Sequence, residues 1–240
     1  MNRSPHPGPG VTPQLPLALR YPPDQRFESF VAAPDAALAQ LHLLAETPGA
    51  DWLYLAGAAK TGKTHLALAL CAAAEQAGRR AVYLPMAAAA GRTREALEAL
   101  EGNDVIALDG LEAAAGTREE EVALFDFHNR ARAAGMNVLY TARGVPDEIG
   151  LTLPDLRSRL SQCARVILSP LDDDGRREVL RDRAHRRGLI LEEAAIDWLL
   201  TRTDRDLGHL IGILEVLDRE SLAAQRRVTV PFLRSVLEAR

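Results

Sequence analysis

The chain has 240 residues, 29 Lys and Arg against 33 Asp and Glu, and a formal net charge of −4. Its length fits one large domain or a core with a small second domain, and its 47% hydrophobic residues can bury a core. The acidic balance argues against a protein that grips nucleic acid through bulk positive charge. Two widely separated cysteines, Cys71 and Cys163, are typical of a reduced, cytoplasmic protein with no disulfide framework or cysteine-based metal site.

The sequence also lacks patterns typical of export or membrane insertion. Residues 1–10 have no apolar core of the kind that a signal peptide needs. The longest uncharged apolar run, 81–90, is shorter than the ~20 residues needed to span a bilayer. We therefore expect no membrane partner.

Residues 1–23 hold seven of the 14 prolines and are expected to form an extended, largely unpacked tail. Within the tail, residues 14–19 (Gln-Leu-Pro-Leu-Ala-Leu) are an apolar island. A polar anchor followed by spaced leucines in an extended segment suits a groove on a partner, because prolines lower the ordering cost of binding. The alternative is a tail that packs on its own domain.

Residues 24–169 alternate between short apolar runs and longer helical patterns. Strands are expected at 52–56, 81–85, 104–109, 137–141 and 164–168, and helices at 64–77, 93–100, 118–134 and 154–161. This alternation predicts an α/β core with a parallel sheet covered by helices on both faces.

Residues 170–240 read as helices alone, at 172–187, 191–203, 206–224 and 231–240. The first of these has acidic residues in its first turn and basic residues toward its end, as the helix dipole favours. We expect a small all-helical lid after the core.

The strongest motif spans residues 57–64, Gly-Ala-Ala-Lys-Thr-Gly-Lys-Thr, and matches GxxxxGK[ST] between an expected strand and helix. Glycines let backbone N–H groups surround a β-phosphate, and the helix N-terminus adds positive potential. Lys63 should reach the β- and γ-phosphates, and Thr64 should offer its hydroxyl to Mg²⁺. The motif contains both lysines of the chain. The residues expected to bind ADP or ATP are Gly57, Lys60, Thr61, Gly62, Lys63 and Thr64.

Asp109 ends an apolar strand, where a carboxylate beside a phosphate loop holds Mg²⁺ through water. Many ATPases carry a second acid at the next position to polarise the attacking water, but Gly110 stands there. Glu112 is two residues further on and cannot be assumed to replace it. We therefore expect a chain that binds nucleotide and hydrolyses ATP poorly alone. Thr141, at another strand end, is expected to contact the γ-phosphate.

Taken together, the residues resemble a known family. The order of phosphate loop, Asp109 strand, segment 153–160 (Leu-Pro-Asp-Leu-Arg-Ser-Arg-Leu) and four-helix lid resembles AAA+ proteins of the DnaA clade, and most closely the Hda family. Residues 14–19 look like the clamp-binding peptide that precedes the AAA+ region in that family. Residues 227–232 (Arg-Val-Thr-Val-Pro-Phe) are similar to the final lid segment of the clade. The phosphate loop is generic, whereas a tail peptide joined to a DnaA-like lid is specific.

The resemblance implies a negative regulator of chromosomal replication initiation. Proteins of this family carry ADP, bind the DNA-loaded sliding clamp (the β subunit of DNA polymerase III) and stimulate hydrolysis of ATP bound to the initiator DnaA. Arg159 resembles an arginine finger acting in trans, and Arg205 resembles the sensor II arginine that contacts nucleotide from the lid. The residues that resemble the docking peptide are Gln14, Leu15, Leu17 and Leu19.

The resemblance has departures, and other functions stay open. Gly110 and Ala142 stand where the initiator clade carries acids, which fits a nucleotide-stabilised regulator better than a motor. Residues 170–240 hold 13 Arg against 14 Asp and Glu, so DNA contact is expected indirectly, through the clamp. The alternatives are a self-sufficient AAA+ ATPase such as a helicase loader, and a P-loop small-molecule kinase. The sequence also leaves open whether the chain forms a homo-oligomer.

Overall fold

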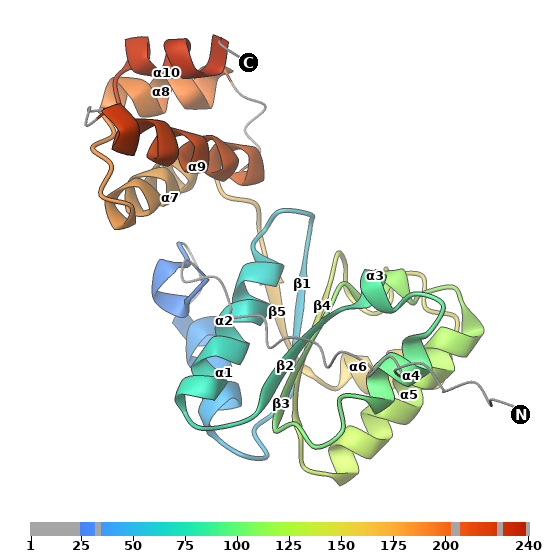
Figure 1. The fold of residues 1–240 in the computed structure, drawn as a ribbon. Coiled ribbons are helices and arrows are strands. Elements are labelled where there is room, and N and C mark those ends of the chain that lie inside the picture. The colour runs from blue at the N-terminus through green and yellow to red at the C-terminus, as the bar shows by residue number, and fades with distance from the viewer. Residues whose placement is uncertain (1–24, 32–34, 203–206, 225–227, 239–240) are drawn as a thin grey trace, which may run out of the picture.

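A parallel five-stranded sheet organises the core of the chain (Figure 1). The computed structural model describes residues 25–31, 35–202, 207–224 and 228–238, so the expected roles of the tail peptide 14–19 and of Arg205 fall outside the described residues. The strand order is β2-β3-β4-β1-β5. The strands are β1 (Leu53–Gly57), β2 (Ala81–Pro85), β3 (Val105–Asp109), β4 (Asn137–Ala142) and β5 (Ala164–Leu168).

Helices cover both faces of this sheet, as the strand-helix alternation predicts (Figure 1). One face packs against α1 (Asp35–Glu46) and α2 (Lys63–Gln76). The other packs against α3 (Met86–Ala89), α4 (Thr93–Glu98), α5 (Arg118–Ala133) and α6 (Pro154–Ser161). Interior strand β1 shows why two cores form: Tyr54 points into one and Leu53 and Leu55 into the other, because strand side chains alternate.

The expected strands and helices of the core are all confirmed, with ends that differ by a residue or two. Helix α1 was not predicted, although its sequence is rich in helix formers and buries Ala37, Leu41, Leu44 and Ala45 at helical spacing. Its signal is easily overlooked because it lies between the Pro-rich tail and the first strand.

Four helices follow β5 and share a hydrophobic core of their own. Asp172 caps the first, since its side chain accepts a hydrogen bond from the Gly175 N–H at 2.8 Å. Arginines of that helix pair with acids of the next: Arg181 Nη2 lies 2.7 Å from Glu193 Oε2, and Arg177 pairs with Asp197. These lid helices are α7 (Asp173–Arg186), α8 (Glu193–Arg202), α9 (Leu207–Ala224) and α10 (Val230–Glu238).

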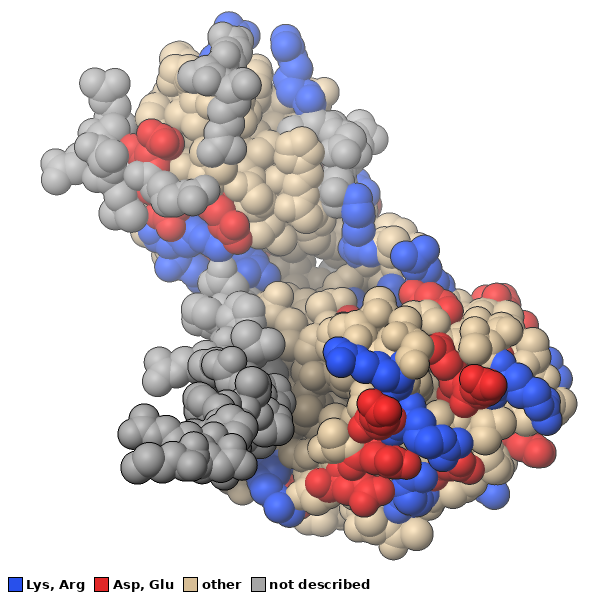
Figure 2. Space-filling model, turned by 45° about the vertical axis from the view of Figure 1, so that its right-hand side comes forward, with Lys and Arg blue, Asp and Glu red and all other residues tan. Residues whose placement is uncertain are grey.

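Figure 2 shows acidic and basic side chains interspersed over one face of the α/β core. No helix in the described ranges has the length and apolar character needed to cross a bilayer.

Glu121 on α5 is a fully buried carboxylate that fixes the start of α6. It accepts hydrogen bonds from the Leu153 N–H (2.6 Å), the Thr152 N–H and hydroxyl (2.9 and 3.0 Å) and the Gly116 N–H (2.8 Å). Burial raises the pKa of Glu121, but these donors outweigh burial and leave the pKa below its usual value. The carboxylate therefore holds residues 152–153 in place at the N-terminus of α6.

We predict that Glu121→Gln lowers the free energy of unfolding by about 3 kcal/mol at pH 7, because an amide cannot accept all of these buried donors. A depressed carboxyl pKa stabilises the fold above the unfolded-state value of 4.5 and loses that effect as the pH falls through the folded-state value. The gap between wild type and variant should therefore narrow in acid. Urea unfolding across pH measures this, with Glu119→Gln, an exposed acid of the same helix, as control. Equal stability of both variants at pH 7 would contradict it.

Candidate nucleotide site

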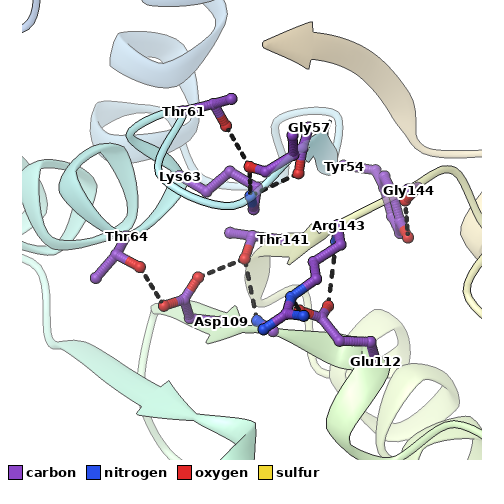
Figure 3. Close-up of polar contacts among 12 residues, drawn as sticks. Tyr54, Gly57, Thr61, Lys63, Thr64, Asp109, Glu112, Thr141, Arg143 and Gly144 are labelled. Carbon is purple, nitrogen blue, oxygen red and sulfur yellow. Dashed lines mark hydrogen bonds and ion pairs between the residues drawn. The ribbon is translucent and has the colours of Figure 1, made fainter. Parts of the chain in front are cut away.

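The phosphate-loop motif lies between β1 and α2, at the carboxyl end of the sheet (Figure 3). Gly57 and Gly62 are required there for steric reasons. A Cβ at Gly57 would lie 2.6 Å from the Leu168 carbonyl oxygen. At Gly62, which has a φ of 91°, a Cβ would lie 2.4 Å from the Phe30 ring. The loop is therefore confined on both sides, by β5 and by the segment before α1.

Lys63 is buried at the beginning of α2, and its ammonium is turned onto the loop itself. Its Nζ donates hydrogen bonds to the carbonyl oxygens of Gly57 and Ala58, each at 2.7 Å. Burial lowers the pKa of Lys63, while the negative charges of Glu112 and Asp109 act in the opposite direction. The hydroxyl of Thr61 also donates to the Ala58 carbonyl, at 3.0 Å. The loop thus has a preformed shape with a cation inside it.

Asp109 is the centre of the polar contacts beside the loop (Figure 3). Its Oδ2 accepts hydrogen bonds from the Thr64 hydroxyl at 2.7 Å and the Tyr83 hydroxyl at 2.8 Å. Its Oδ1 accepts one from the Thr141 hydroxyl. Parallel pairing explains the last contact, since Asp109 and Thr141 are register partners on β3 and β4. The structure therefore brings Thr64, Asp109 and Thr141 together, as the sequence analysis expected.

The donor set beside Asp109 fits a magnesium ion. Thr64 and Asp109 present a hydroxyl and a carboxylate oxygen 2.7 Å apart, and Mg²⁺ in nucleotide sites takes few protein oxygens together with phosphate oxygens and waters. Within the described residues there is no cluster of three or more His, Cys, Asp or Glu side chains that could hold a metal by itself. Thr64 and Asp109 would hold the ion, which would offset the negative charge of the phosphates.

Glu112 and Arg143 form an ion pair at the rim of the site (Figure 3). Arg143 Nε lies 3.1 Å from Glu112 Oε1, and the Arg143 backbone N–H donates to Glu112 Oε2 at 3.2 Å. Glu112 comes from the short 3-10 helix η2 (Leu111–Ala113), and Arg143 directly follows β4. Gly110, between Asp109 and η2, has a φ of 83°.

His65, the first residue after the motif, connects the loop helix to two distant segments. Its Nε2 donates to the Arg26 carbonyl at 2.9 Å, and its Nδ1 accepts from Arg183 of α7 at 3.3 Å. A carbonyl can only accept and a guanidinium can only donate, so these partners select the neutral Nε2–H tautomer. Arg186 of α7 also donates to the Glu28 carbonyl, at 2.9 Å. The lid, the residues before α1 and the phosphate loop therefore meet at one point.

Arg159 lies apart from this cluster, on the exposed surface of α6. Across the described ranges its guanidinium forms no ion pair, whereas neighbouring Arg157 pairs with Asp147 at 3.4 Å. Arg159 is close enough to the core that its charge, after burial and together with Arg132, helps to lower the pKa of His128 to about 4. The structure therefore places Arg159 where a second protein can reach it.

The comparisons with known proteins agree with this architecture. A family model described as the lid domain of Hda matches residues 173–237. The fold is similar to domain III of the replication initiation protein DnaA from Thermotoga maritima, with a TM-score of 0.75 and 20% identity over 91% of this chain and 98% of that one. The lid of this chain is therefore Hda-like.

Two further solved structures have a fold similar to that of this chain. DnaA from Aquifex aeolicus, bound to AMPPCP, is 21% identical over 85% of this chain and 68% of that one, with a TM-score of 0.69. RuvB from Thermotoga maritima, a Holliday junction branch migration motor, is 17% identical over 90% and 72%, with a TM-score of 0.61. At these identities the likeness establishes the fold, an α/β core followed by a helical lid.

Four residues of the site were not predicted from the sequence: Tyr83, Arg143, Phe30 and His65. Tyr83 lies in the middle of β2, and only the pairing of β2 with β3 brings its hydroxyl to Asp109. Arg143 and His65 could have been suspected from the sequence, because each lies within two residues of an expected site residue.

We predict that Lys63→Ala weakens binding of a fluorescent ADP by roughly 10- to 100-fold, because a charge-assisted hydrogen bond to phosphate is worth about 1.5–3 kcal/mol. A basic residue away from the loop provides the control. Arg94 is exposed on α4 and pairs with Asp126 at 3.1 Å, so Arg94→Ala removes a cation without touching the phosphate loop. Titration of both variants measures the difference, and equal losses would show that Lys63 has no special part in phosphate binding.

Proposed function

We propose that this Hda-like chain is a nucleotide-bound negative regulator of chromosomal replication initiation that stimulates hydrolysis of ATP held by the initiator DnaA. The observation that carries the proposal is the match of residues 173–237 to the Hda lid, joined to a core that resembles DnaA in fold. In this proposal residues 24–169 are the nucleotide-binding core and residues 170–240 the lid. The chain works in the cytoplasm and is an accessory to a partner ATPase rather than a substantial enzyme alone.

The nucleotide site has the role of stabilising the regulator. ADP or ATP binds through the loop residues 57–64 with Mg²⁺ at Thr64 and Asp109, and Thr141 lies beside them. Arg205 contacts the nucleotide from the lid. Support for the loop as a phosphate site comes from its glycine-dependent shape and from the buried Lys63 ammonium.

Arg159 is the finger that acts on the partner. An arginine supplied in trans stabilises the charge that develops on a transferred phosphoryl group and accelerates hydrolysis by ~10³–10⁵. The exposure of Arg159 and its lack of an ion pair within the described ranges support this role, because the guanidinium need not be released from another partner first.

The tail and the clamp complete the proposal. Gln14, Leu15, Leu17 and Leu19 dock residues 1–23 onto the DNA-loaded β clamp, so the chain meets DNA indirectly. The mixed surface charge of the described residues in Figure 2 supports indirect contact, since direct phosphate binding needs a basic surface.

We predict that Arg159→Ala abolishes stimulation of phosphate release from DnaA-bound ATP, in an assay with ADP and clamp loaded on DNA. Binding of ADP and of clamp should be unchanged, because Arg159 lies on α6, apart from the phosphate loop, and the proposed docking peptide is a separate segment, residues 14–19. Arg157→Ala is the matched control: it removes a neighbouring arginine that is already paired with Asp147. Full stimulation by the Arg159 variant would remove this residue from the mechanism.

We predict that Gln14→Ala reduces the stimulation of phosphate release from DnaA-bound ATP in assays that depend on clamp loaded on DNA. Without clamp, the variant and the wild type should behave alike. Pull-down on clamp-loaded DNA should show weaker retention of this variant, with ADP affinity unchanged. If instead the wild-type chain does not stimulate DnaA and hydrolyses ATP rapidly alone, the function is that of a self-sufficient ATPase such as a helicase loader.

A further inference from the structure

Position 110, next to Asp109, has a backbone that disfavours an acidic side chain. Its φ of 83° is in the left-handed region, where an L-residue with a side chain is strained. Two hydrogen bonds from the Gly110 N–H fix this conformation, to the Thr141 carbonyl at 3.1 Å and to the Thr141 hydroxyl at 3.0 Å. The glycine is therefore part of the architecture that holds Thr141 beside Asp109.

The turn at Gly110 brings Glu112 into the space beside that position. A Cβ added at Gly110 would lie 3.9 Å from Glu112 Oε1, so the carboxylate is within van der Waals contact of the position that a side chain at 110 would occupy. Glu112 is half-buried, with 29% of its side chain exposed. Its carboxylate thus reaches the region that an acid at position 110 would otherwise serve.

Arg143 holds this carboxylate at both oxygens. The guanidinium Nε contacts Oε1 at 3.1 Å, and the backbone N–H of the same residue donates to Oε2 at 3.2 Å. The loop that carries Arg143 is anchored in turn, because the buried Tyr54 hydroxyl donates to the Gly144 carbonyl at 3.0 Å. The backbone N–H that orients Glu112 therefore belongs to an anchored loop, and the exposed Arg143 guanidinium adds a second contact.

Of the two acids near Lys63, Glu112 has fewer of its acceptor sites occupied by protein groups among the described residues. Asp109 already accepts from three hydroxyls, those of Thr64, Tyr83 and Thr141. Glu112 accepts none from a hydroxyl within the described residues.

We propose that Glu112 is the carboxylate that orients and deprotonates the attacking water when ATP occupies this site, and that Arg143 is its positioning residue. The inference rests on the nucleotide binding proposed above and adds slow intrinsic conversion of bound ATP to ADP. The water oxygen bonds to the γ-phosphorus while the bond from that phosphorus to the β,γ-bridging oxygen breaks. The electron pair of the broken bond stays on ADP, and the water proton passes to the Glu112 carboxylate and then to solvent.

The test is single-turnover hydrolysis of radiolabelled ATP by excess full-length chain, with nucleotide affinity measured separately. Glu112→Gln keeps the shape of the side chain but removes its basicity, so the rate should fall by about 10²-fold, as for loss of a general base. ADP affinity should remain within twofold of wild type. Glu119→Gln, an exposed acid on α5, is the matched control and should hydrolyse ATP at the wild-type rate.

A second readout needs no turnover. Aluminium fluoride with ADP imitates the transferring phosphoryl group together with its bound water, so Glu112→Gln should lose affinity for that complex more than for ADP alone. Arg143→Ala should also slow hydrolysis, Arg143→Lys should restore part of the rate, and the double variant with Glu112→Gln should be no slower than Glu112→Gln alone.

The possible results separate this inference from the proposed function. If the wild-type chain does not bind ADP, both the regulator proposal and the role of Glu112 are wrong. Wild-type chain that binds ADP but shows no hydrolysis, or Glu112→Gln that hydrolyses ATP as fast as wild type, would overturn the role of Glu112 and leave the regulator proposal intact. A slow variant with unchanged ADP affinity would establish Glu112.

Discussion

The Asp109 carboxylate joins three elements of the core at the nucleotide site. It accepts hydrogen bonds from Thr64 at the beginning of α2, Tyr83 in β2 and Thr141 in β4. Hydrogen bonds to an ionised acceptor are stronger than those between neutral groups. They fix the end of β3 relative to the phosphate loop, and the position of the Gly110 turn and of Glu112 follows from that.

A second constraint connects the site to the rest of the chain. His65 lies one residue beyond the motif and contacts both the segment before α1 and helix α7 of the lid. Phe30 packs against the phosphate loop at Gly62, so the entry of the chain into the core depends on the same loop. A change in the conformation of the loop on nucleotide binding would therefore alter its contacts with the lid and with the segment before α1.

Glu121 connects the exposed Arg159 to the buried core. Its carboxylate fixes Thr152 and Leu153, directly before α6 begins, and α6 presents Arg159 on the surface. Leu156 and Leu160 of the same helix are buried, which sets the rotation of α6 and turns Arg159 outward. The role that we propose for Arg159 needs this rigidity, because a misplaced charge loses most of its effect.

The sequence by itself determined the parallel α/β class, the lid helices, the phosphate loop and the acid that ends β3. These features are local: a glycine-rich motif, strand-length apolar runs and the 3.6-residue period of helices are all written in contiguous residues. Helix α1 was equally local and was overlooked. Arg159 was found through the segment 153–160, but its exposure is a property of the folded α6.

Only the tertiary structure decided how Asp109, Glu112, Tyr83, Arg143 and Glu121 are used. Tyr83 and Asp109 are 26 residues apart, and Glu121 and Leu153 are 32 apart. The register of parallel strands and the packing of helices set which of these groups meet, and no local pattern encodes them. Glu112 is two residues beyond Gly110, and its carboxylate lies beside position 110 only because the backbone is left-handed at the glycine.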